Sequence, residues 1–204
     1  VNWVDTSAAA TAQMVLELVE YLGVPLDPDM ATCLLNGIVT DTQGFRTPNT
    51  TPRVVAAALR LMEAGASLPY IAQQVFNRRP ISQIRLWARA LTEMQLDGRV
   101  LWATITPDMR RDCQMTEDGD GGLVGFLVSA VEADVAIVFA QQEDGTVEVS
   151  MRAVPGIDVS GVAFSLGGGG HPQAAGCKLQ PPLEEAQQRV LQAVKEALRR
   201  QTGQ

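Results

Sequence analysis

The chain has 204 residues, 46% of them hydrophobic, with a formal net charge of −7. This length accommodates one or two domains, and the hydrophobic content is ordinary for a globular protein. An acidic chain is not built to coat duplex DNA, although a short nucleotide can still occupy a local basic pocket. No apolar run reaches membrane-spanning length, so we expect no membrane partner.

Three cysteines are spread along the chain, at Cys33, Cys113 and Cys177. Their spacing matches neither a metal-binding motif nor a disulfide framework. Free cysteines are typical of a reducing compartment, so the sequence predicts a cytoplasmic protein.

The first hundred residues have mostly helical periodicity, after a short apolar piece at 1–5 that we interpret as the end of a strand. Asp27 or Asp29 can cap the second helix, and Pro52 suits the first turn of the third. The predicted helices cover residues 8–22, 29–39, 52–64, 67–76 and 80–96.

The pattern changes after Asp97-Gly98, where strand-like segments begin. Glu143-Asp144-Gly145 is a strong hairpin signal between two of them. We predict strands at 99–106, 135–141, 146–153 and 177–179, helices at 123–131 and 183–200, and a short helix from 158–160 toward the glycine-rich stretch. Residues 107–117 read as a polar connection, and we place a domain boundary at about 106–118.

Asp41 directly follows an apolar run, with Thr40 and Thr42 on either side and Gly44 close behind. A carboxylate at the end of a buried element, before a glycine turn, is well placed to bind a metal. An aspartate that only caps or turns the chain would have the same surroundings, so this pattern alone leaves both roles open.

Four consecutive glycines, Gly167, Gly168, Gly169 and Gly170, precede His171, the single histidine of the chain. Glycine permits backbone conformations closed to other residues and lets a ligand approach bare N–H groups. With Pro172 next, the stretch reads as a glycine loop that opens a short helix, whose positive end would favour a phosphate. A flexible loop before a helix is the alternative.

The order Gly-Gly-Gly-His, two further residues, then Ala-Ala-Gly176 resembles the substrate-binding loop of the DHH phosphoesterase superfamily, in the domain that follows the catalytic DHH domain. Thr40-Asp41-Thr42, then Gly-Phe-Arg46 and Asn49 to Pro52, is similar to the third metal-binding motif of that family. Gln43 departs from the pattern, because family members often have glycine directly after Thr-Asp-Thr.

The resemblance implies a role for each matching residue. Asp41 would be a ligand of a two-metal site, usually manganese, and the catalytic residue. Arg46, the four glycines, Arg152 and His171 would bind the substrate, and a guanidinium suits a phosphate because it donates two parallel hydrogen bonds. From the residues alone, Arg152 can equally pair with Glu148 or Asp158, and His171 can bond its own loop.

The family fold implied is α/β. Residues 1–105 would be the C-terminal half of a DHH catalytic domain, mostly helical here, and 118–204 a smaller α/β DHH-associated domain with a mixed sheet. Asp41 is the one family metal ligand with a match in this sequence, and Asp27-Pro-Asp29 does not correspond to any of the others. We therefore expect either a fragment of an ordinary enzyme, which the missing initial methionine favours, or a protein that binds without cutting.

The activity implied is that of a small-oligonucleotide phosphoesterase, which shortens very short RNAs and removes the 3′ phosphate of adenosine 3′,5′-bisphosphate. Its partner would be a short single-stranded RNA or a small nucleotide, and a homodimer is left open. The alternatives are a cyclic-dinucleotide phosphodiesterase, a larger RecJ-type exonuclease and a non-catalytic nucleotide-binding module. An alanyl-tRNA synthetase tail carries the glycine motif but would not explain residues 40–46.

Overall fold

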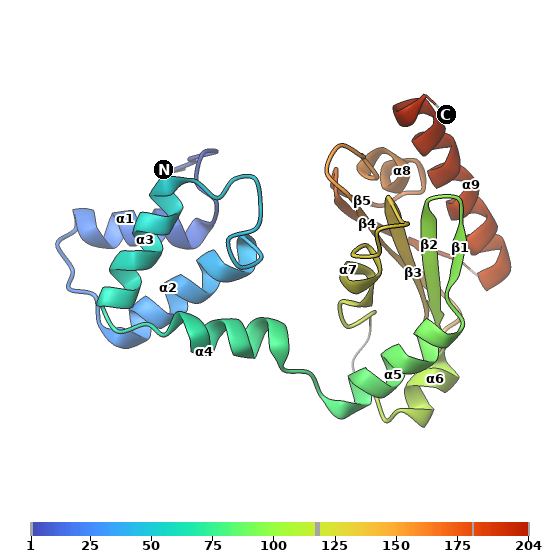
Figure 1. Ribbon diagram of the computed structural model, residues 1–204, viewed down its shortest axis with the longest axis horizontal. Helices are drawn as coiled ribbons and strands as arrows, with labels where there is room; N and C mark the ends of the chain where they lie inside the picture. Colours follow the sequence, from blue (N-terminus) through green and yellow to red (C-terminus); the bar gives the residue numbers. More distant parts are fainter. Residues whose placement is uncertain (1, 117–118, 181, 204) are drawn as a thin grey trace. The chain divides into compact units, whose positions relative to one another are not determined.

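The structure, a computed structural model, describes residues 2–116, 119–180 and 182–203 (Figure 1). The chain divides into two compact units, Val1–Arg78 and Arg79–Gln204. Each unit is described by itself. In the second unit, the elements between 79 and 112 pack with the strands that follow them. The domain boundary at about 106–118 stays a prediction.

The first unit is helical, with α2 packed against both α1 and α3. The Asp27 carboxylate accepts a hydrogen bond from the Met30 N–H at 2.8 Å, which fixes the start of α2 as predicted. Leu35 and Ile38 on α2 are fully buried in the core of the unit. Its elements are α1 (Thr11–Tyr21), α2 (Pro28–Asp41), α3 (Pro52–Glu63), α4 (Leu68–Ala72) and the π-helix η1 (Gln73–Asn77).

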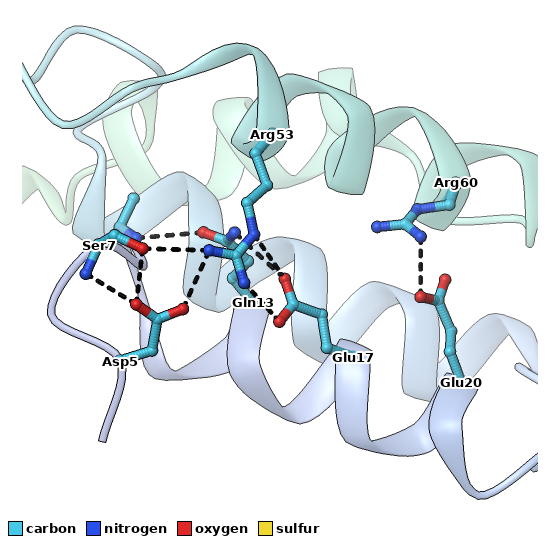
Figure 2. A network of polar contacts seen from close by, with 8 residues as sticks. Asp5, Ser7, Gln13, Glu17, Glu20, Arg53 and Arg60 are labelled. Atoms are coloured by element: carbon cyan, nitrogen blue, oxygen red, sulfur yellow. Dashed lines mark hydrogen bonds and ion pairs between the residues drawn. The ribbon is translucent and has the colours of Figure 1, made fainter. Parts of the chain in front are cut away.

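A network of polar contacts joins the first residues of the chain and α1 to α3 (Figure 2). Arg53 on α3 contacts both carboxylate oxygens of Glu17, at 2.9 and 2.6 Å, and an oxygen of Asp5 at 2.9 Å. Arg60, two turns further along α3, binds Glu20 at 2.8 Å. The strand expected at 1–5 is wrong for residues 2–5, which are irregular, and Val1 lies outside the described residues. Of these residues, Asp5 takes part in the network.

The second unit contains a six-stranded mixed sheet with the order β1-β2-β3-β4-β6-β5. Strands β2 and β3 are parallel, and all other neighbours are antiparallel. The α/β class and the mixed sheet predicted from the sequence are confirmed. The strands are β1 (Gln95–Asp97), β2 (Val100–Ile105), β3 (Val135–Gln141), β4 (Val147–Ala153), β5 (Gly169–His171) and β6 (Ala174–Leu179).

Helices cover the two faces of this sheet unequally. One face carries a continuous apolar core with Phe139 and Met151 at its centre, packed against α8 and α9. On the other face, α5, α6 and α7 cover β2 and β3. The helices of this unit are α5 (Ile81–Thr92), α6 (Pro107–Asp112), α7 (Leu123–Leu127), α8 (Ser160–Ser165) and α9 (Leu183–Thr202).

Three expectations for this unit were wrong. The polar connection at 107–117 contains helix α6, which begins where the Thr106 hydroxyl accepts from the Met109 N–H at 3.2 Å. Strand β1 was expected to be the end of a helix. The glycine stretch opens no helix, because β5 and β6 form a hairpin with Pro172 and Gln173 between them.

Among the described residues no single helix combines the length and the hydropathy needed to cross a membrane. Two consecutive helical segments, Pro52–Glu63 and Leu68–Asn77, are together long and apolar enough, but they are bent by 110° at the break between them.

The Asp5 contacts predict a pH-dependent stability. The Ser7 hydroxyl, the Ser7 N–H and Arg53 lower the pKa of Asp5 from 3.8 to about 2. A carboxyl group with a depressed folded pKa stabilises the fold above its unfolded pKa, and this contribution is lost as the pH falls toward 2. We expect Asp5→Asn to lower the melting temperature at pH 7, and the difference from the wild type to shrink between pH 4 and pH 2. A difference of the same size at pH 2 would contradict this assignment.

Candidate functional site

The residues that the sequence analysis selected fall into both compact units. Asp41 and Arg46 lie in the first, and Arg152, the four glycines and His171 lie in the second. The structure therefore defines two separate candidate regions, one around the end of α2 and one at the β4, β6 and β5 strands.

Asp41 is the last residue of α2 and is exposed. The negative end of a helix dipole lies at its C-terminus, and α2 has no basic residue in its last turn. Thr42, directly after it, is buried; its hydroxyl donates to the Ile38 carbonyl at 2.6 Å and accepts from the Phe45 N–H at 3.0 Å. The Asp41 carboxylate thus stands on a fixed turn, at a position where a cation would be stabilising.

The turn that follows runs through three consecutive left-handed residues, Gln43 at φ 49°, Gly44 at 73° and Phe45 at 65°. Non-glycine residues pay a free-energy cost for this conformation, so the surrounding contacts must hold it. The Arg46 Nε donates to the Gln43 carbonyl at 2.7 Å, and the Arg46 guanidinium lies 5.8 Å from the centre of the Phe76 ring. Gln43, the departure from the family motif, thus adopts a backbone conformation that glycine would favour.

A shallow cleft of about 300 Å³ lies beside this turn. Phe45, Leu68 and Phe76 give it mostly apolar walls, with Arg46 among its lining residues. Sequence reasoning found Arg46 but missed this cleft, because Leu68 and Phe76 belong to helices twenty or more residues downstream.

A two-metal site needs several carboxylates or imidazoles close together. The described residues contain no group of three or more His, Cys, Asp or Glu side chains that could hold a metal ion. Asp41 is one candidate ligand, and the ligand set of the described residues does not fit a two-metal centre.

The sheet register brings together Arg152 and His171. Ala174 on β6 is the partner of Arg152 on β4 and also of His171 on β5. Directly opposed residues of antiparallel strands point to the same face, and neighbouring strands lie about 4.8 Å apart. Arg152 and His171 therefore project from the same face, about 10 Å apart at their backbones, with only the small Ala174 side chain between them.

The next row of this face consists of Ser150, Gly176 and Gly169. Together with Ala174 these residues form a patch of small side chains between the Arg152 and His171 positions, which we call the small-residue floor. Helices α5, α6 and α7 pack mainly on the β2 and β3 part of the same face, and α7 also contacts β4. The small-residue floor is thus where side chains of the sheet are short and partly exposed.

Arg152 is half-buried, and one of its terminal nitrogens donates to the Met151 carbonyl at 3.2 Å. The two carboxylates considered as its partners have other contacts. Glu148 lies 4.0 Å from Lys178, and Asp158 accepts from the hydroxyl and the N–H of Ser160, which lower the pKa of Asp158. His171 is exposed at the end of β5.

The steric and backbone constraints that favour glycine differ among the four positions. A Cβ on Gly168 would lie 2.1 Å from the Gly176 carbonyl oxygen, and one on Gly170 would lie 2.5 Å from the Ala175 Cα. Gly167 has a φ of 82°. A Cβ on Gly169 would meet only the Phe164 ring, at an ordinary 3.7 Å. Gly168 and Gly170 are therefore required by the close approach of the hairpin backbones, Gly167 is favoured by its left-handed φ, and Gly169 has neither constraint.

The predicted helix N-terminus is absent at this loop, so it provides no dipole for an anion. Strand β5 is the last strand of the described sheet, and one edge of its backbone faces no other strand. An edge strand presents unpaired N–H and C=O groups. Backbone donors remain available at the glycine stretch, but from a strand edge.

Comparison with known proteins gives consistent results. Residues 112–200 match the DHHA1 domain. The chain is 40% identical over 199 residues to the bifunctional oligoribonuclease and PAP phosphatase NrnA of Thermus thermophilus, which covers 97% of this chain and 60% of that protein. It is 26% identical to the cyclic-di-AMP phosphodiesterase PdeA of Listeria monocytogenes, over 94% of this chain and 29% of that protein.

The fold is similar to that of an exopolyphosphatase-related protein from Bacteroides fragilis, with a TM-score of 0.86 at 22% sequence identity, covering 93% of this chain and 57% of that chain. The chain belongs to the DHH superfamily, a metal-dependent family, and its second unit carries the DHHA1 domain. It spans little more than half the length of the curated relatives it matches first.

The glycine contacts generate a stability prediction. Gly168→Ala and Gly170→Ala place a methyl group against backbone atoms that cannot move aside, so we expect each to lower the free energy of unfolding by about 1–3 kcal/mol. Gly169→Ala has room and should change it by less than about 0.5 kcal/mol. Urea denaturation of the three variants measures these values. Equal losses at all three positions would mean that the hairpin packs differently.

Proposed function

We propose that this chain provides the nucleotide-binding part of a phosphoesterase of short oligoribonucleotides and of adenosine 3′,5′-bisphosphate, that it lacks most of the metal ligands of that activity, and that the small-residue floor binds the nucleotide. The observation that carries the proposal is the placement of Arg152 and His171 on one face, with Ala174 between them. The 40% identity to an oligoribonuclease and PAP phosphatase supports it.

The chemistry of the two side chains suits a phosphate. The Arg152 guanidinium can donate two parallel hydrogen bonds to phosphate oxygens. The His171 imidazole can donate a third bond. Small side chains between them leave space for the phosphate to approach the strands. Arg46, in the first unit, stays a predicted substrate-binding residue. These residues hold and orient the substrate; none of them performs the hydrolytic step.

We propose manganese as the metal that Asp41 binds. When bound, metal ions of such sites activate water and neutralise charge on the leaving oxygen. Asp41 by itself cannot hold two ions, so hydrolysis requires ligands in addition to it. A cytoplasmic location is proposed because Cys33, Cys113 and Cys177 are free. Short single-stranded RNA is the proposed partner, and a homodimer stays a prediction.

Hydrolysis of a cyclic dinucleotide is the second candidate. The 26% identity to a cyclic-di-AMP phosphodiesterase favours it. The two substrates differ in their ends, because the linear pApA carries a terminal 5′ phosphate and a cyclic dinucleotide does not. Competition between pApA and cyclic-di-AMP for the same site separates the two functions: tighter binding of the cyclic compound would favour the second candidate.

Substitution of the two phosphate-binding residues tests the site. We expect Arg152→Ala and His171→Ala each to weaken binding of pApA by about ten-fold or more, since a hydrogen bond to a charged group contributes about 1.5–3 kcal/mol. Isothermal titration of the full chain measures the affinity. Arg85→Ala, at an exposed arginine of α5, is the matched control and should leave it unchanged. Unchanged affinity in both site variants would remove the small-residue floor from the function.

The ligand set predicts the activity of this chain. We expect the 204 residues by themselves to hydrolyse neither pApA nor adenosine 3′,5′-bisphosphate above background with manganese, because the described residues offer Asp41 without a cluster of further ligands. Release of AMP, measured by chromatography, is the assay. Manganese-dependent turnover that Asp41→Asn abolishes would show that the ligand set has been misread.

A further inference from the structure

Phe164 is a large aromatic residue that the fold leaves in solvent. It belongs to α8, whose neighbouring residues Val162 and Ala163 are buried in the core of the second unit. The Phe164 side chain is instead 66% exposed. The hydrophobic core therefore gives no reason for an aromatic ring at this position.

The contact between Phe164 and β5 shows which face of the sheet the ring reaches. Two ring atoms, Cε1 and Cζ, lie 3.7 and 3.9 Å from the point where a Cβ on Gly169 would be. Side chains two residues apart on a strand point to the same face, so the Cβ direction of Gly169 is also that of His171. Although α8 packs on the other face of the sheet, the Phe164 ring therefore lies at the edge strand β5, on the side of Gly169 and His171 and at the margin of the small-residue floor.

Gly169 keeps the ring uncovered. It is the one glycine of the four whose φ and surroundings do not demand glycine. A larger side chain at position 169 would pack against the Phe164 ring and fill the space between the ring and strand β5. A glycine at this position, next to an exposed aromatic ring, leaves an open surface with one aromatic wall and one backbone wall.

We propose that the Phe164 ring and the bare backbone of Gly169 form a stacking subsite for a nucleobase. The ligand class follows from what lies beside it. His171 is two residues along the strand, about 7 Å away, and is one of the two phosphate-binding residues of the proposed function, on which this subsite rests. A flat aromatic group joined to a phosphate by a short linker is a nucleotide, and stacking on an aromatic side chain accepts any base.

The test compares a ligand that has bases with one that has none, on the full chain. The dinucleotide pApA supplies bases and phosphates, and ribose 5-phosphate supplies a phosphate alone. We expect Phe164→Leu, which keeps an apolar side chain but removes the ring, to weaken pApA binding by about five-fold to a hundred-fold. Binding of ribose 5-phosphate should not change. Phe164→Tyr, which keeps the ring, should retain the wild-type affinity for pApA.

Two further measurements separate stacking from a structural role. Tyr21→Leu removes an exposed aromatic ring of the first unit and should leave both affinities unchanged. In the wild-type complex, nuclear Overhauser contacts should connect the adenine H2 or H8 protons to the Phe164 ring protons.

Each contrary outcome has a different meaning. Equal weakening of pApA and ribose 5-phosphate by Phe164→Leu would show that the ring supports the loop, which overturns the subsite. Unchanged pApA affinity in this variant also overturns it, and if sedimentation then shows that the variant loses self-association, the ring contacts a second copy of the chain. If wild-type protein binds neither ligand, the proposed function fails, and the subsite fails with it.

Discussion

The register of the β4, β6 and β5 strands is the constraint on which the candidate site depends. Next to β5, the Gly168 backbone approaches the Gly176 carbonyl so closely that no Cβ fits between them, which favours the observed pairing of β5 with β6. With this approach in place, Ala174 is opposed by Arg152 on one side and by His171 on the other. A shift by one residue would turn these side chains to the opposite face, into the apolar core.

Much of the fold was predictable because the hydrophobic period was clear. The strand expected at 146–153 and the helix expected at 183–200 are present as β4 and α9, and the bounds of β3 were exact. Helix α6 was missed because its sequence, Pro107–Asp112, is polar, although Thr106 as N-cap and Pro107 in the first turn are local start signals; its one apolar side chain, Met109, packs into the core. Local pattern carries no information on such tertiary contacts.

The candidate site was predictable in its residues and not in its geometry. The motif identified His171 and Arg152, but the interpretation of Pro172 as a first helical residue gave the wrong backbone around them. A proline also suits the turn of a hairpin, and only strand pairing decides between the two. Phe164 could not be found from sequence, because an aromatic residue on a short helix normally indicates core.

The parallel pairing of β2 with β3 has a consequence for the order of folding. The chain between these two strands runs through residues 106–134 and includes α6 and α7, whereas β3 and β4 are separated by residues 142–146 alone. Closing a longer loop costs more chain entropy before any contact is gained. The β3–β4 hairpin can therefore form early, and β2 must join a sheet whose hairpin already exists, which makes the strand pairing of highest sequence separation a late event in assembly of this unit.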